Sequence, residues 1–223
     1  MTRLVWLAYV WLAMLSGAAV SGSYLWRSGA PQDTKDSVDG WVRGNYTRVL
    51  DLALRNRCSE DPVQARRAMD ARWLACVRIV PAFKNENESS ASLEKRYDGT
   101  LFAQLVRPKG HSVYVQLRER KKQQPSESPA GLAKLIEIES TSGDQRRFPG
   151  LSRLADEFEK MQVSPVLSDE LMMDATEYRF SIRAPYGESL DLTLLGPGAA
   201  APRQPPGLIQ WAESLKETFA TPR

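Results

Sequence analysis

Disulfide formation is the first chemistry that the residue types suggest. The chain of 223 residues contains two cysteines, Cys58 and Cys76. In an exported protein, an even pair of cysteines is most simply a disulfide. Closing a loop of this size would stabilise the fold by roughly 3 kcal/mol. The alternative is a pair of buried free thiols, since unpaired cysteine behaves as a small apolar residue. We expect the Cys58–Cys76 bond.

Histidine offers little for acid–base catalysis in this chain. His111 is the only histidine, and it falls in a predicted turn beside Lys109 and Gly110. The spacing identifies no nucleophile or carboxylate that would surround it. One histidine and two cysteines are also too few nitrogen and sulfur ligands for a zinc site. The sequence has no glycine-rich phosphate loop and no Gly-x-Ser-x-Gly elbow. We expect no catalytic residue, cofactor or metal, and interpret His111 as an exposed turn residue.

Charged residues form two basic clusters and two acidic pairs. Outside the cytoplasm, the basic clusters could meet anionic lipid headgroups or an acidic partner, but an exposed hairpin end is the simpler interpretation. The acidic pairs do not converge, because one lies on different sides of a predicted helix and the other on the exposed face of a predicted strand. The basic clusters are Arg118–Lys122 and Arg146-Arg147, and the acidic pairs are Glu137 with Glu139 and Glu157 with Glu159. We interpret both acidic pairs as solvated surface.

The N-terminus has the pattern of a membrane-targeting segment. Arg3 precedes an uncharged run over residues 4–26, which is apolar at first and then rich in small residues. This order is typical of a signal peptide, with cleavage after Ala18, Ser21 or Gly22. Alternatively, the 23-residue run would span roughly 34 Å as a helix and anchor the chain in the inner membrane. Both interpretations place residues 28–223 outside the cytoplasm, in the periplasm or another extracytoplasmic compartment.

The composition is that of a globular protein with enough apolar residues for a core. Hydrophobic residues make up 42% of the chain, and 30 basic and 27 acidic side chains give a formal charge of +3. This near balance argues against a nucleic-acid-binding protein, which would carry a strong basic excess on one face. We divide the chain into a targeting segment (1–26), a linker (27–36) and an extracytoplasmic α+β domain (37–223), with a candidate sub-boundary near 140–165.

Two helices are predicted at the start of this domain. Ser37 has the character of a helix cap, and apolar residues at helical spacing predict an amphipathic helix over 38–57. Asp61-Pro62 pairs a capping residue with a proline suited to the first helical position. The second predicted helix therefore begins there and runs at least to Ala71.

The conformation after Arg72 decides whether the disulfide can form. Alternating apolar residues over 73–79 predict a strand, although the pattern also permits a helix continuing from 62 to 80. In one unbroken helix, Cys58 and Cys76 would lie at opposite ends. The predicted disulfide therefore requires a chain reversal near Arg72.

The middle of the chain has the pattern of an antiparallel hairpin around residues 108–111. In that hairpin, Val113, Val115 and Leu117 would share a face with Leu101, Ala103 and Leu105 of the preceding strand. The predicted order is a loop over 84–96, strands over 100–107 and 112–120, a charged loop over 121–128 and a strand over 134–140.

The second half shows a weak internal repeat, which could record a duplicated strand–strand–helix unit or arise by chance. Helices with one apolar stripe are predicted over 148–161 and 206–219, with a hairpin of strands 178–184 and 190–195 between them. The hairpin has one apolar face, which the last helix should cover. In that packing, Leu208, Trp211, Leu215 and Phe219 of the helix contact Phe180, Ile182, Leu190, Leu192 and Leu194 of the hairpin.

These features favour a protein that binds other proteins. The first hypothesis is an extracytoplasmic binding module, such as a periplasmic inhibitor or immunity protein against a toxin or hydrolase. The alternative is a single-pass membrane assembly subunit of a secretion, pilus, division or respiratory complex, and the third is an unrecognised hydrolase. The expected partners are a protein and, through residues 4–26, a membrane, with no nucleic acid and no small-molecule substrate. A cleaved N-terminus would favour the soluble binder, and an intact one the assembly subunit.

Overall fold

The computed structural model describes residues 37–59, 71–82, 87–161, 175–184, 189–196 and 207–220. The predicted targeting segment and the linker lie outside these residues. The helix predicted from Asp61-Pro62 also lies outside them, except for Ala71, which begins a strand. Within the described part of the chain, no helix is both long and apolar enough to cross a membrane.

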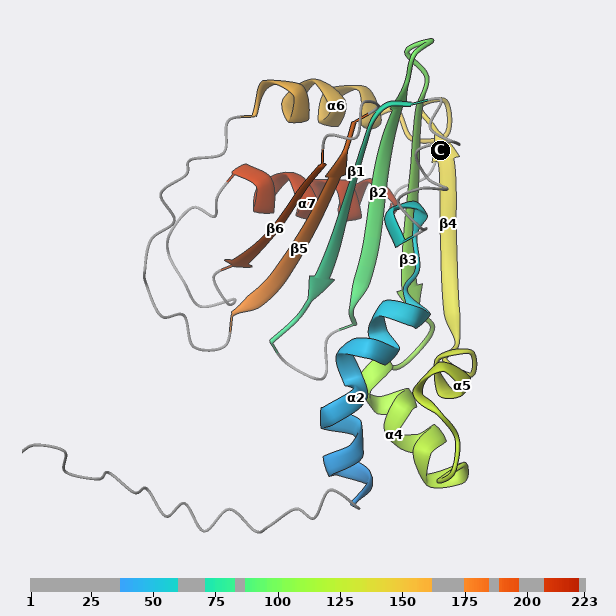
Figure 1. Cartoon of the computed structure of the whole chain (residues 1–223). Helices are drawn as coiled ribbons and strands as arrows, with labels where there is room; N and C mark the ends of the chain where they lie inside the picture. The colour runs from blue at the N-terminus through green and yellow to red at the C-terminus, as the bar shows by residue number, and fades with distance from the viewer. Residues whose placement is uncertain are drawn as a thin grey trace, which may run out of the picture. The chain divides into compact units, whose positions relative to one another are not determined.

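A six-stranded antiparallel sheet lies at the centre of the described structure (Figure 1). The strand order is β4-β3-β2-β1-β5-β6, so the chain returns from an edge strand to pair β5 with β1. Strands on both sides of the 140–165 region thus belong to one sheet. The strands are β1 (Ala71–Val80), β2 (Ser89–Arg96), β3 (Leu101–Pro108), β4 (Ile138–Asp144), β5 (Thr176–Arg183) and β6 (Ser189–Gly196). The α+β class and the strands predicted after Arg72 and around 178–195 are confirmed.

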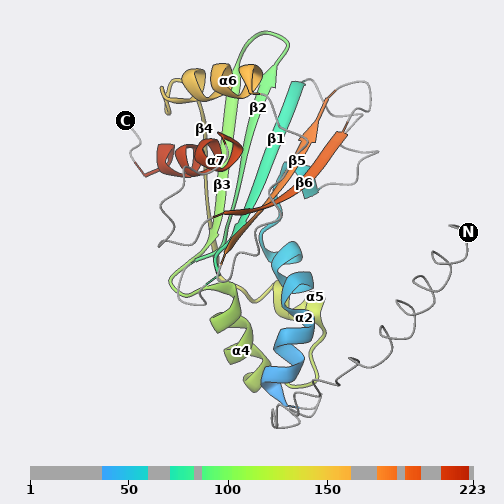
Figure 2. The same ribbon diagram turned by 90° about the vertical axis from the view of Figure 1, so that its left-hand side faces the viewer.

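One face of the sheet carries the main hydrophobic core under two helices. These are α6 (Leu151–Lys160) and α7 (Gly207–Thr218), which lie on the same side of the sheet (Figure 2). Their apolar stripes pack against alternate residues of the central strands. As predicted, α7 and the last hairpin contribute apolar residues to the same core, but α7 packs mainly against α6 and β2, and Leu190 of the hairpin is 46% exposed. The main core includes Trp73, Val77, Leu93, Phe148, Leu154, Phe180, Leu194, Leu208, Trp211, Leu215 and Phe219.

Three further helices form a second hydrophobic cluster near one end of the sheet (Figure 1). They are α2 (Val38–Ala53), α4 (Val113–Gln123) and α5 (Pro129–Ala133). The Ser37 side chain accepts a hydrogen bond from the Gly40 backbone at 3.0 Å and so caps α2, as predicted. The predicted helix over 38–57 is confirmed but ends at Ala53. Leu50, Leu54, Leu117 and Leu132 are buried in this cluster, together with Val106 from β3.

The strand predicted over 112–120 is wrong, because this segment forms α4. The Ser112 hydroxyl accepts a hydrogen bond from the Val115 backbone at 3.3 Å, which caps the helix. Val113, Gln116 and Leu117 are buried at helical spacing. Since α4 packs on α2, the apolar residues of this segment contact the second cluster instead of the face of Leu101, Ala103 and Leu105.

Two other predictions in the middle of the chain need correction. Residues 89–96, expected to be part of a loop, form β2, a central strand. The sequence of β2 is mostly polar and therefore resembles a loop, because only two alternate residues, Ala91 and Leu93, enter the main core. The strand expected over 134–140 begins later, at Ile138, because residues 134–137 form a turn after α5 that places Ile136 in the second cluster with Leu132.

Candidate functional site: a polar cleft beside the disulfide

The second face of the central strands is polar. In an antiparallel sheet, residues paired across strands lie on the same face. Cys76 of β1 is paired with Ser92 of β2 and Ser181 of β5. Two residues further along β1, Arg78 lies between Ser90 and Arg179. Rows of small and charged side chains therefore cross this face, opposite the rows that form the main core.

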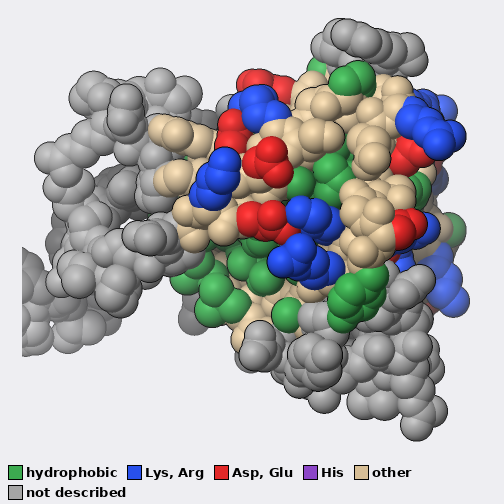
Figure 3. All heavy atoms as spheres, turned by 90° about the horizontal axis from the view of Figure 1, so that it is seen from above, with side chains coloured by type: hydrophobic (Ala, Val, Ile, Leu, Met, Phe, Trp, Pro, Cys, Tyr) green, Lys and Arg blue, Asp and Glu red, His purple; other side chains and the backbone are tan. Residues whose placement is uncertain are grey.

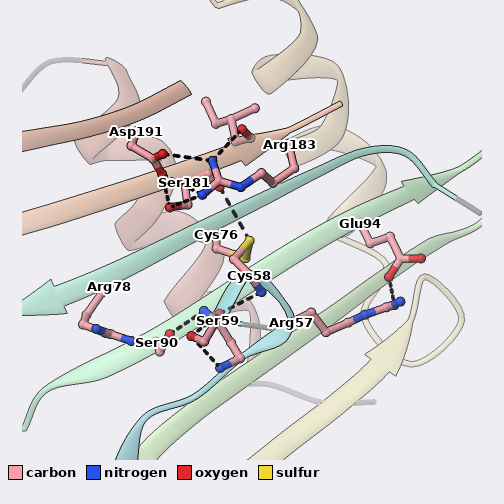
Figure 4. The surroundings of a disulfide bond; sticks show 12 residues. Arg57, Cys58, Ser59, Cys76, Arg78, Ser90, Glu94, Ser181, Arg183 and Asp191 are labelled. Atoms are coloured by element: carbon pink, nitrogen blue, oxygen red, sulfur yellow. Dashed lines mark hydrogen bonds and ion pairs between the residues drawn. A yellow bond between two sulfur atoms is a disulfide. The ribbon is translucent and has the colours of Figure 1, made fainter. Parts of the chain in front are cut away.

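A short 3-10 helix, η1 (Arg57–Ser59), is attached to the polar face through a cystine (Figure 4). Cys58 of η1 lies at disulfide distance from Cys76 of β1, with Cα atoms 6.2 Å apart. The Cys58 sulfur also lies 3.7 Å from the carbonyl oxygen of Ser181 in β5. The predicted pairing is thus present in the structure, and β1 begins at Ala71, close to the chain reversal that the pairing requires.

Asn56 holds the same segment by side-chain hydrogen bonds. Its amide oxygen accepts from the Cys58 backbone at 3.0 Å and from the Ser59 hydroxyl at 3.2 Å. Its amide nitrogen donates to the Ser90 hydroxyl of β2 at 2.6 Å. Because one amide bonds both the turn and the sheet, it fixes the position of η1 on β2.

A buried carboxylate provides a further attachment. Glu94 of β2 is only 3% exposed and forms an ion pair with Arg57 of η1 (Figure 4). A second guanidinium, that of Arg96, approaches the other carboxylate oxygen at 3.2 Å. A carboxylate taken out of water needs such partners, so Glu94 ties the start of η1 to the sheet.

A cleft of about 460 Å³ opens beside η1 on this polar face. Its walls come from the end of α2, the following turn, η1 and the strands β1, β2 and β5. The residues lining it are Asp51, Leu52, Arg55, Asn56, Cys58, Ser59, Cys76, Arg78, Ser90, Arg179 and Ser181.

Three guanidinium groups line the cleft, each in a different setting. Arg78, 14% exposed, forms an ion pair with Asp51, and burial lowers its pKa. The hydrogen bond from Arg179 Nε to Glu177 at 2.5 Å raises the pKa of Arg179, and its Nη1 lies 3.9 Å from Asp51. Arg55 is exposed and forms no ion pair with any residue that the structure describes. Arginine stays protonated in proteins, so all three remain cations.

The cleft is therefore suited to bind a group that accepts hydrogen bonds and carries negative charge. Its side-chain hydroxyls are already engaged with neutral or acidic partners: Ser90 accepts from Asn56, and Ser181 donates to Asp191. Arg55 and Arg179 offer the accessible donors. Guanidinium groups bind carboxylates and phosphates with paired, directional hydrogen bonds.

Apart from Cys58 and Cys76, the residues that the sequence singled out lie elsewhere. His111 is exposed in the turn between β3 and α4, and its carbonyl oxygen accepts from Gln116 Nε2 at 2.8 Å. In the basic clusters, Arg118 pairs with Asp39 at 2.7 Å, and the Arg147 guanidinium lies over the Phe148 ring. On the face in Figure 3, basic and acidic side chains are interspersed. Among the described residues, no group of three or more His, Cys, Asp or Glu side chains could hold a metal ion.

Sequence reasoning missed the three arginines of the cleft. One signal was present: Arg78 interrupts the apolar residues of β1, and a charge within such a strand indicates that its second face is polar. Nothing in the spacing connects Arg55 or Arg179 to it, since they come from a turn after α2 and from β5.

Comparison with known proteins does not add a family or a relative. The chain matches no protein-family model, no curated protein sequence and no solved structure.

Proposed function

We propose that this chain is an extracytoplasmic module that binds another protein, with the polar cleft as part of the contact surface. The observation that carries the proposal is the arrangement of Arg55 and Arg179 around a cleft whose wall is fixed by the Cys58–Cys76 pair. A fixed wall reduces the ordering that binding would otherwise require, which favours affinity. An inhibitor or immunity protein against a toxin or hydrolase is the finer form of this proposal, because such proteins act through preorganised surfaces.

The extracytoplasmic assignment has two supports. Arg3 and the uncharged run over 4–26 are typical of a targeting segment. A cysteine pair at disulfide distance is typical of proteins that fold in an oxidising compartment. A reporter active only outside the cytoplasm, fused after residue 36, should give signal. Activity from a cytoplasmic reporter alone would overturn the assignment.

Site-specific cross-linking in the source cells tests the binding function. A photoreactive amino acid placed at Ser59, an exposed residue that lines the cleft, should yield a discrete cross-linked band. Tyr97, 59% exposed in the turn between β2 and β3, is the matched control position. The band at Ser59 should weaken when Arg179→Glu is added. Equal bands at both positions, or none at either, would contradict the proposal.

The single-pass assembly subunit is a second candidate, which the uncharged run over 4–26 favours because it is long enough to span a bilayer. Mass spectrometry of the mature protein separates the two. An intact N-terminus that extracts only with detergent supports the assembly subunit, whereas cleavage after Ala18, Ser21 or Gly22 supports the soluble binder.

A further inference from the structure

Among the residues that the structure describes, the arginines lining the cleft outnumber the carboxylates that pair with them. Arg55, Arg78 and Arg179 contribute three positive charges, whereas Asp51 and Glu177 contribute two negative ones. One carboxylate oxygen of Asp51 faces two guanidiniums, those of Arg78 and Arg179. The difference is one positive charge, and it resides at Arg55, the exposed arginine without an ion-pair partner in the described structure.

The three arginines differ in what a ligand can reach. Arg78 is largely buried, and its Nε–H has no hydrogen-bond partner in the described structure. Its guanidinium contacts Asp51 and, at 3.4 Å, the Leu54 carbonyl oxygen, which hold it at the base of the cleft. Arg179 is 34% exposed, and its Nε and Nη2 are occupied by Glu177. Its Nη1, at 3.9 Å from Asp51, is beyond hydrogen-bond distance and available to a new acceptor.

We propose that the cleft binds a carboxylate presented by the partner protein, an acidic side chain or a C-terminus, between Arg55 and Arg179 Nη1. This inference rests on the proposed function and specifies its ligand. A carboxylate carries one negative charge, which matches the single excess positive charge found among the described residues. Its two oxygens suit donors that approach from two sides. A phosphate group would bring up to two negative charges, whereas the site has one excess positive charge to neutralise them.

Asp51 is the internal competitor of this ligand. It occupies the position next to Arg78 and Arg179 that an incoming carboxylate oxygen would approach. Like charges repel, so Asp51 limits how strongly a second carboxylate is held. Replacing it with asparagine keeps the shape and removes the charge. Asp51→Asn should therefore strengthen carboxylate binding, whereas Arg55→Gln and Arg179→Gln should weaken it.

The test uses the full chain with its disulfide intact and a small carboxylate as the probe. N-acetylglutamate amide is titrated while the arginine Nε–H resonances are followed by NMR. N-acetylglutamine amide serves as the neutral isostere and inorganic phosphate as the dianion. We expect the carboxylate, but not its neutral isostere, to shift the Arg179 resonance. The affinity obtained from this titration should weaken about fivefold in Arg55→Gln, which corresponds to the free energy of an exposed charge pair. Arg146→Gln is the matched control, since Arg146 is exposed, has no ion pair among the described residues and does not line the cleft.

Each result bears on the proposal separately from the binding function. A carboxylate affinity that falls in Arg55→Gln, is unchanged in Arg146→Gln and rises in Asp51→Asn supports it. A stronger response to phosphate, equal responses to both amides, or no response overturns the carboxylate assignment. If Ser59 still cross-links to a partner in that case, the protein-binding function stands and only its ligand chemistry is wrong.

Discussion

The two faces of the sheet are held by different means. On the face under α6 and α7, Trp73, Val77 and Leu93 belong to a continuous hydrophobic core. On the other face, the same strands carry Arg78 and Glu94, and the covering segment is attached at separate points by a cystine, an amide and an ion pair. Apolar contacts stabilise in proportion to the area that they remove from water, whereas these attachments depend on individual bonds.

The difference explains where an open cleft can form. An apolar face must be covered fully, because exposed apolar surface favours aggregation. A polar face can stay open between its attachments, because water satisfies the groups that protein does not. The cleft lined by Arg55 and Arg179 lies on the polar face. In this molecule the apolar face carries the main hydrophobic core, and the polar face carries the cleft.

Removing the central aromatic of the apolar face should have the largest effect. Trp211 is 2% exposed, its ring centroid lies 4.9 Å from that of Phe158, and its Nε1 donates to the Leu154 carbonyl at 2.9 Å. Trp211→Ala should reduce the free energy of unfolding by about 3–5 kcal/mol, measured by urea denaturation. Tyr97→Ala, at an exposed position, is the control. If Trp211→Ala unfolds like wild type yet loses the cross-linked partner, then α7 is the interface with the partner and does not cover the apolar face.

Removing the cystine should destabilise less and act on the polar face. The double variant Cys58→Ser, Cys76→Ser opens a loop with a sequence separation of 18 residues. The expected loss is about 3 kcal/mol, on the scale of a loop of this length. Non-reducing mass spectrometry of exported wild type should first show the linked peptides. Two freely alkylated thiols in that material would remove the main attachment of η1, and the contrast between the faces would then rest on polar contacts alone.

Neutralising the buried carboxylate of the polar face should have a smaller effect. Glu94→Gln keeps the side-chain shape but loses the charge that faces Arg57 and Arg96. Both arginines are partly exposed, so they can be hydrated, and we expect a loss of about 1–2 kcal/mol by urea denaturation. Glu157→Gln, which removes an exposed pair with Arg153, should change stability by less than about 0.5 kcal/mol. Equal losses in the two variants would show that Glu94 does not hold η1.

The same contrast explains which elements could be predicted from the sequence. Helices α2, α6 and α7 and strands β5 and β6 each have one apolar stripe or face, and their periodicity is visible. Strand β2 was missed because it contributes only Ala91 and Leu93 to the core, and its other residues look like those of a loop. Helix α4 was misassigned because Val113, Val115 and Leu117 fit an alternating pattern, and only the packing on α2 selects the helix.

The cleft itself was beyond sequence reasoning, except for its cystine. The Cys58–Cys76 bond could be predicted because a chain with two cysteines allows only one intramolecular disulfide. The arginines come from a turn, β1 and β5, and their convergence depends on the return of the chain that places β5 beside β1. That register is set by the apolar face, since a shift of one residue would turn Phe180 out of the core.

The smallest predicted effect concerns acid, at the rim of the apolar face. The Glu159 carboxylate accepts hydrogen bonds from Lys95 Nζ at 2.8 Å and Trp73 Nε1 at 2.9 Å, and these bonds lower its pKa from the usual range of a glutamate. A carboxyl whose pKa is lower in the folded state adds stability above its unfolded pKa and loses it as pH falls through the folded value. Between pH 6 and pH 3, the melting temperature of Glu159→Gln should therefore fall by about 1–2 °C less than that of wild type. Glu157→Gln, two residues away on α6, should follow wild type. Parallel curves for wild type and Glu159→Gln would mean that Trp73 is held by packing alone, and that the apolar face has no polar attachment at this rim.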